Sequence, residues 1–186
     1  MSVVHIFNPS HDEALAANTP YYTPAKAAAV LEYDLAALPA WWACQDDIVL
    51  VPKGHALDGQ RINGCVLTSA PDWGKIIHVC PWGWDAAIVR RLVRLGAPQD
   101  LLPTDLQLDE IRKLSSRETS VAILENMVAE TERCIGKSWW VTSSDEVRKL
   151  SAHFQTLVLK APWSSSGRGV FKVSADNLDV MQYRVE

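Results

Sequence analysis

The sequence lacks several features that would each have indicated a particular class of protein. No apolar run reaches the roughly 18 residues of a membrane-spanning helix. The opening stretch MSVVHIFNPSHDE has no basic flank of the kind that begins a signal peptide. Basic residues are not in excess, because the formal net charge is −4. The chain therefore offers no electrostatic footprint for nucleic acid or an anionic membrane. We expect a cytoplasmic protein without nucleic-acid or membrane partners.

Cysteine is scarce and scattered along the chain. The 186 residues include four cysteines, and no two of them form a C-x-x-C pair. This spacing disfavours both a structural zinc site and a disulfide framework, and it predicts reduced thiols. The four residues are Cys44, Cys65, Cys80 and Cys134.

The first part of the chain alternates strand patterns with helix patterns. Short apolar and β-branched runs predict strands at 2–7, 47–52, 64–69 and 75–81. Helical patterns follow at 11–18, where Ser10 and Glu13 fit a capping box, and at 25–38 and 85–96. Such alternation is typical of a parallel sheet with helices on both faces. We predict an α/β fold with a Rossmann-like sheet over residues 1–112.

The second part, residues 113–186, has a different order. A capping box at Ser115 and Glu118 predicts a long helix, and 137–142 predicts a strand. Ser143 with Glu146 predicts another capped helix, followed by strands at 156–160 and 170–173 and a final helix from 174. We predict a partial α+β subdomain, with the boundary between the two domains at residue 112.

Nine residues, 161–169, separate the last two predicted strands, whereas most hairpin loops have two to five. Hydroxyl groups and glycine backbone amides in this loop suit an anion-binding nest. Lys160 directly precedes the loop, and Arg168 lies within it, so that two positive charges are available to an anion. The loop is not a Walker-A motif, because G-x-x-x-x-G-K-[ST] is absent and a strand follows it. The alternative is a surface hairpin whose serines only solvate it. The candidate phosphate-binding residues are Lys160, Ser164, Ser165, Ser166, Gly167, Arg168 and Gly169.

Polar residues also crowd the turn after the first strand. In a doubly wound sheet, ligands bind beyond the carboxyl ends of the strands, so this turn could contact a carboxylate or amine substrate. The alternative is ordinary helix capping. The His–Asp spacing matches no metal-ligand template, and we predict no metal site. The candidate substrate-binding residues are Asn8, Ser10, His11 and Asp12. The run RRLVR at 90–94 is interpreted as a solvated helix face.

The stretch VLKAPWSSSGRGV, residues 158–170, resembles the glycine-rich phosphate loop of the ATP-grasp superfamily. The matching positions are Lys160, Pro162, Ser164 to Ser166, Gly167, Arg168, Gly169 and Val170. The resemblance implies that Lys160 contacts nucleotide phosphates and that the loop closes over them. The order of elements also resembles a pre-ATP-grasp domain followed by an ATP-grasp domain, in which Arg117 matches a basic residue that faces ATP. A bacterial branch of the superfamily has sequences that resemble three further stretches of this chain, FNPSHDEALAAN, LPAWWA and PWGWD.

This resemblance implies an ATP-dependent carboxylate–amine or carboxylate–thiol ligase that uses ATP and Mg²⁺ and activates a small carboxylate as an acyl phosphate. In that superfamily the magnesium-binding residues follow the hairpin, and this sequence ends about 17 residues after Gly169. We therefore expect an N-terminal portion that is inactive alone. An exposed apolar face of the hairpin would then favour a homodimer. The alternative function is a non-catalytic Rossmann-like binding or assembly module with a degenerate ATP-grasp part.

Overall fold

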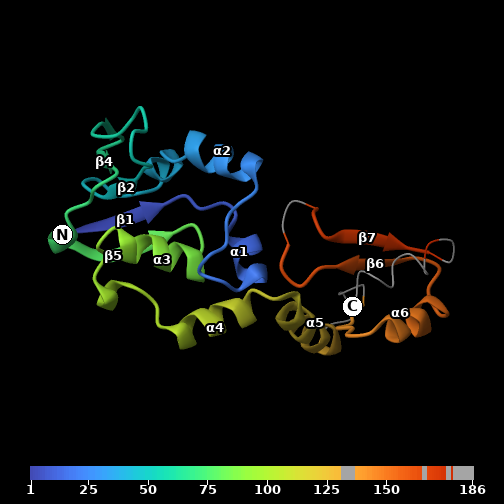
Figure 1. Ribbon diagram of the computed structural model, residues 1–186. Helices are drawn as coiled ribbons and strands as arrows, with labels where there is room; N and C mark the ends of the chain where they lie inside the picture. Colours follow the sequence, from blue (N-terminus) through green and yellow to red (C-terminus); the bar gives the residue numbers. More distant parts are fainter. Residues whose placement is uncertain (131–136, 165–166, 175–176, 178–186) are drawn as a thin grey trace. The chain divides into compact units, whose positions relative to one another are not determined.

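The computed structural model describes residues 1–130, 137–164, 167–174 and 177 (Figure 1). The chain divides into two compact units, Met1–Arg112 and Lys113–Glu186, which we call unit 1 and unit 2. The division falls inside a helix, between residues 112 and 113, where the sequence analysis also places the domain boundary. Each unit has a sheet of its own, of five strands in unit 1 and two strands in unit 2.

Unit 1 is an α/β unit built on a mostly parallel sheet. Strand β1 lies between β2 and β5 and is parallel to both, and β2 is also parallel to β4. The short strand β3 adds an antiparallel edge, so that the sheet order is β3-β4-β2-β1-β5. The strands are β1 (Ser2–Ile6), β2 (Ile48–Leu50), β3 (Arg61–Ile62), β4 (Cys65–Thr68) and β5 (Ile76–Pro81). This mostly parallel sheet is compatible with the predicted Rossmann-like fold.

Helices and 3-10 turns connect these strands. Helix α3 begins after Asp85, whose carboxylate accepts from the Ile88 N–H at 2.8 Å, and it ends before Gly96, which has φ of +84°. Both are standard signals for helix ends and both are visible in the sequence. The helical segments are α1 (His11–Ala17), α2 (Lys26–Asp34), η1 (Leu38–Trp41), η2 (Trp73–Lys75), α3 (Ala86–Arg94), η3 (Gln99–Leu101) and α4 (Asp105–Leu114).

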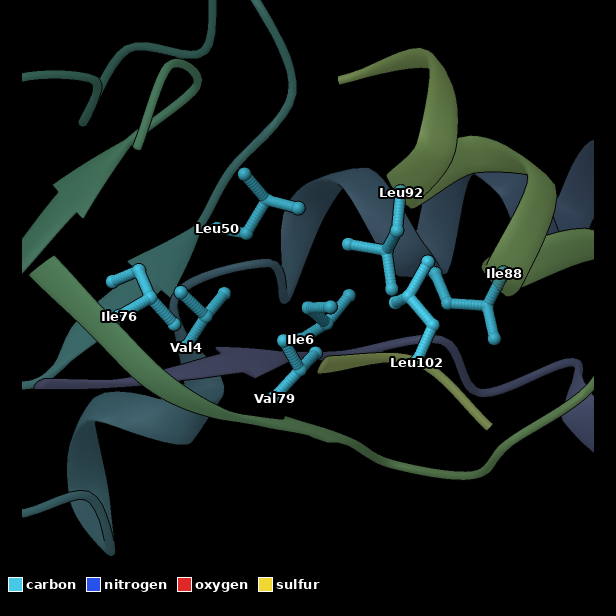
Figure 2. Packing of buried hydrophobic residues seen from close by; sticks show 8 residues of the cluster. All are labelled: Val4, Ile6, Leu50, Ile76, Val79, Ile88, Leu92 and Leu102. Carbon is cyan, nitrogen blue, oxygen red and sulfur yellow. The ribbon is translucent and has the colours of Figure 1, made fainter. Parts of the chain in front are cut away.

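Two hydrophobic clusters cover opposite faces of the sheet. The first cluster joins residues of β1, β2 and β5 to Ile88 and Leu92 of α3 (Figure 2). The second cluster packs Val49 and Leu67, from the other face of β2 and β4, against alanines around η1. Because successive strand residues point to opposite faces, Val49 and Leu50 belong to different clusters. Burial on both faces explains why the strands read as nearly continuous apolar runs.

Two details of unit 1 differ from the sequence prediction. The helix predicted over 25–38 ends at Asp34, and the chain continues into the separate turn η1. The capping box at α1 is absent, because the Ser10 side chain makes no cap hydrogen bond. The Glu13 carboxylate accepts instead from the Tyr22 hydroxyl at 2.7 Å. A tertiary hydrogen bond has replaced the local one that the motif predicts.

Unit 2 contains two helices and an antiparallel hairpin, α5 (Arg117–Glu130), α6 (Ser144–Ser151), β6 (Leu157–Lys160) and β7 (Val170–Val173). The capping box at Ser143 and Glu146 is confirmed. At α5 the hydroxyl that accepts from the Glu118 N–H is that of Ser116, not Ser115. The final helix predicted from 174 lies largely outside the described residues.

The strand predicted at 137–142 is wrong, because this segment belongs to no helix or strand. Its Trp139 packs on the Phe154 ring at a centroid distance of 5.1 Å. The residue types that favour strands also suit other half-buried surfaces, and here the aromatic contact has taken the place of a ladder.

The cores of the two units differ in size. Of the buried hydrophobic side chains in the described residues, 18 belong to unit 1 and two, Val147 and Val173, belong to unit 2. Several large apolar side chains of unit 2 are about half exposed, including Ile123, Met127 and Val158. Unit 2 therefore buries little apolar surface of its own. Among the described residues, no helix is both long enough and apolar enough to cross a membrane.

Candidate functional site

The loop between β6 and β7 is closed at its base by a backbone hydrogen bond. The Ala161 N–H donates to the Gly169 carbonyl at 2.7 Å, directly after the last ladder pair, Lys160 and Val170. The hairpin thus keeps the nine-residue loop that the sequence predicts. Ser165 and Ser166 lie outside the described residues.

Arg117 holds the first half of this loop. Its guanidinium donates to the Ala161 carbonyl at 2.8 Å, and to the Ser164 carbonyl and hydroxyl at 2.9 and 2.8 Å. The Arg117 backbone N–H also donates to the Pro162 carbonyl at 3.1 Å. The planar donor fork of arginine suits such multiple contacts. The structure therefore places Arg117 against the loop backbone, where it fixes the path of the loop.

Two glycines set the second half of the loop. Gly167 and Gly169 have φ of +76° and +63°, a region that side chains other than glycine rarely adopt. A Cβ on Gly169 would lie 2.8 Å from the Cβ of Ala161, whereas a Cβ on Gly167 would meet nothing within 4 Å. Gly169 is needed for close packing at the loop base as well as for its backbone angle.

The cations of the hairpin are exposed. Lys160 ends β6 and makes no ion pair with any residue that the structure describes. Strand β6 alternates half-buried and exposed residues, and Lys160 lies on the exposed face with Val158. Cross-strand pairing places Lys172 opposite Val158 on this same face. Arg168, in the loop, is also exposed.

The turn after β1 meets the end of β5 through Asn8. The Asn8 side chain is buried; its amide group donates to the Gly83 carbonyl at 2.7 Å and its amide oxygen accepts from the Gly83 N–H at 3.2 Å. The same amide group is 3.3 Å from the Asp85 carboxylate. Between β1 and β5 the chain order across the sheet reverses, and ligands of open α/β sheets bind outside the strand ends at such a point.

Asp85 is the buried acid of this edge. Burial raises the pKa of its carboxyl, although hydrogen bonds from the first turn of α3 act in the opposite direction. Tyr22 lies close by, and its burial together with the Glu13 carboxylate raises the pKa of its hydroxyl to about 12. Tyr22 is therefore a neutral hydrogen-bond donor at physiological pH.

A cavity of about 650 Å³ opens at this edge of unit 1. Of the four predicted substrate-binding residues, Asn8 and Ser10 line the cavity. His11 and Asp12 are not part of its lining, and they contact each other at 3.3 Å, Nε2 to Oδ1. The ring of His11 also occupies the space beside Gly83 that a Cβ would need. The structure thus separates the predicted group into two pairs.

Sequence reasoning missed other residues of this cavity. Asp85 carries a visible signal, since it precedes a clear amphipathic helix and caps it. Tyr22 and the arginines of α3 carry none, because their approach to the cavity depends on how α3 and the segment 18–25 pack. Among the described residues, no group of three or more His, Cys, Asp or Glu side chains is placed to hold a metal ion.

Two tryptophans of this edge, on either side of Gly83, divide between core and surface. Trp84 packs against the first hydrophobic cluster, whereas Trp82 is 53% exposed. The Trp82 ring contacts Phe7 and Trp42 at centroid distances of 5.5 and 6.0 Å.

Comparison of the chain with protein-family models, curated proteins and solved structures gave no match.

Proposed function

We propose that unit 2 binds the phosphates of ATP at the 161–169 loop, in the manner of an ATP-grasp-type carboxylate–amine or carboxylate–thiol ligase. The observation that carries the proposal is the contact between Arg117 and the loop. A hairpin that only solvates its serines needs no arginine with three hydrogen bonds to keep its first half in one shape. Preorganised loops cost less to order when a ligand binds.

The chemistry of the loop fits a polyphosphate. Gly167 and Gly169 have the positive φ angles that turn successive N–H groups toward one side in anion-binding nests. Lys160 supplies an exposed ammonium group at the start of the loop, and Arg168 supplies a guanidinium near its end. In this proposal Lys160 and Arg168 contact phosphate oxygens, while Arg117 is a positioning residue.

The hairpin does not fit a role in holding Mg²⁺. Residues 157–173 contain no Asp or Glu, and oxygen ligands from carboxylates are what Mg²⁺ prefers. We therefore assign phosphate contacts, and no contact with the metal ion, to this segment. Asn8 and Ser10, at the sheet edge of unit 1, are proposed to contact the small carboxylate substrate.

The test measures ATP binding to the 186-residue chain by isothermal titration calorimetry. Lys160→Ala should weaken binding at least about tenfold, because a charge-assisted hydrogen bond contributes about 1.5–3 kcal/mol. Lys172→Ala is the matched control, since it removes the same charge from the same face of the same hairpin. Its affinity should stay within about twofold of the original chain.

Two outcomes would count against the proposal. Absence of ATP binding at millimolar concentration would exclude a preformed phosphate loop. An equal loss in both lysine variants would indicate general attraction to a basic face, and would favour the alternative of a non-catalytic Rossmann-like binding module.

A further inference from the structure

Half of the basic residues of unit 1 line one cavity. Unit 1 is acidic, with eight Lys and Arg against thirteen Asp and Glu. Four of the eight line the 650 Å³ cavity at the carboxyl edge of the sheet, whereas its described lining includes two acidic residues, Glu32 and Asp85. The basic residues are Lys53, Arg90, Arg91 and Arg94. The local charge is therefore opposite in sign to that of the unit.

Two of these side chains are held in place by neighbours. The Arg91 guanidinium donates to the Glu32 carboxylate of α2 at 2.5 Å, and both groups are largely shielded from solvent. The Arg90 guanidinium carbon lies 4.1 Å from the centre of the Tyr21 ring, a cation–π contact. These contacts join α3 to α2 and to the segment before α2.

The other two cations are exposed. Lys53 follows β2 after Pro52, and Arg94 lies in the last turn of α3. In the part of the chain that the structure describes, neither forms an ion pair. Arg94 is also four residues from Arg90 on the same helix, a like-charge spacing that destabilises a helix. An anion in the cavity would relieve this repulsion.

The rest of the wall is mainly apolar. Pro20, Pro24, Val51 and Ile88 contribute to it, and its volume lies within the range of about 300–1,000 Å³ that small-molecule sites occupy. The cavity also lies at the edge of the sheet where open α/β folds bind ligands. A ligand with a charged group and an apolar body matches this lining.

We propose that this cavity binds a small organic anion with two adjacent negative charges, a phosphate monoester or a dicarboxylate, whose charged group contacts Lys53 and Arg94. This inference rests on the part of the proposed function that places the substrate beside Asn8 and Ser10 of the same cavity. Arg90 and Arg91 are positioning residues that also contribute to the positive potential. The sequence interpretation of 90–94 as a solvated helix face is extended by this proposal, because part of that face lines the cavity. Helical spacing puts residues 90, 91 and 94 on one side, while Ile88 and Leu92 enter the core.

The test titrates the 186-residue chain with phenyl phosphate, phthalate, benzoate and benzamide, which share one ring and differ in charge. Binding is followed by calorimetry and by the shift in melting temperature. Phenyl phosphate, phthalate or both should bind at least about tenfold more tightly than benzoate, and benzamide should not bind measurably. Preference for phenyl phosphate identifies a phosphate monoester as the ligand class, and preference for phthalate identifies a dicarboxylate.

Variants locate the site. Lys53→Ala and Arg94→Ala should each weaken binding at least about fivefold. Lys75→Ala and Arg61→Ala, which remove the same charges from exposed positions elsewhere in unit 1, should leave it unchanged. Lys160→Ala should also leave it unchanged, because this inference does not rest on nucleotide binding by unit 2. Failure of both dianions to bind below about 1 mM, or equal losses in the control variants, would overturn the proposal.

Discussion

Asn8 and Asp47 are buried polar side chains that join separate strands of unit 1. Asn8 makes two hydrogen bonds with the backbone of Gly83, 75 residues away in the chain. The Asp47 carboxylate accepts from the Val3 and Cys44 N–H groups, both at 3.0 Å, and lies 3.1 Å from the His5 ring nitrogen. Buried polar groups must find such partners, and each partner fixes the register of a strand end.

Asp47 should make the stability of unit 1 depend on pH. Burial would raise the pKa of its carboxyl, but the hydrogen bonds from Val3, His5 and Cys44 outweigh burial and lower the pKa below its ordinary value. A group with a lowered folded-state pKa stabilises the fold above its unfolded pKa, near 4, and that contribution is lost as the pH falls below this value. Chemical unfolding should therefore show that Asp47→Asn is less stable at pH 7 and loses less stability between pH 5 and pH 3.

The control for this prediction is Asp34→Asn, at an exposed position of α2. It should leave both the stability at pH 7 and its acid dependence near those of the original chain. If Asp47→Asn lost stability in parallel with the original chain down to pH 3, the hydrogen bonds of Asp47 would not be the source of the dependence.

At the scale of elements, the hairpin of unit 2 shows how an unusual loop is kept in one shape. The ladder of β6 and β7 is short, with four residue pairs. Arg117 of α5 holds the first half of the loop by hydrogen bonds, and two glycines with positive φ shape the second half. Its conformation is therefore determined by contacts from α5 as well as by its own sequence.

Alanine substitutions at the two glycines should differ in effect. Both must adopt a positive φ, which costs alanine about 1 kcal/mol. Only at Gly169 would the new Cβ also approach Ala161, at 2.8 Å. Hydrogen exchange of the Ala161 N–H should therefore speed up much more in Gly169→Ala than in Gly167→Ala. Equal exchange rates in the two variants would show that the base of the loop can widen at no cost.

At the scale of the whole molecule, the two units differ in how much apolar surface they bury. Unit 1 has a sheet with a hydrophobic cluster on each face, whereas the described part of unit 2 has two buried hydrophobic side chains. Unit 2 exposes apolar side chains, Val158 and Val170 of the hairpin among them, and the homodimer stays a prediction.

Hydrogen exchange over the whole chain should report two stabilities. Amides of β1, β2 and β5 should be protected much longer than those of α5 and α6, because opening a unit exposes its buried apolar surface to water. Mass spectrometry of peptides from both units at low protein concentration is the measurement. Equal protection of both units would show that they unfold as one cooperative body.

Much of the element pattern could be predicted from local signals. The parallel strands, the cap of α6 and the nine-residue loop all follow from periodicity and turn chemistry within a few residues. Two predictions from local signals were wrong, because contacts with residues farther along the chain outweighed the signals. Glu13 pairs with Tyr22 and does not complete the capping box of α1, and Trp139 of the predicted strand 137–142 packs on Phe154. The candidate site was predicted less completely, because Tyr22 and the α3 arginines reach the cavity only through packing.

The sequence by itself determined most of the strands and helices, and which loop carries serine, glycine and arginine, since these depend on neighbours along the chain. Only the tertiary structure decided that Arg117 fixes that loop, across 44 and 47 residues. It likewise decided that Lys53 and the arginines of α3 line the same cavity. Contacts of this separation depend on how whole elements pack, and no periodicity within one segment encodes them.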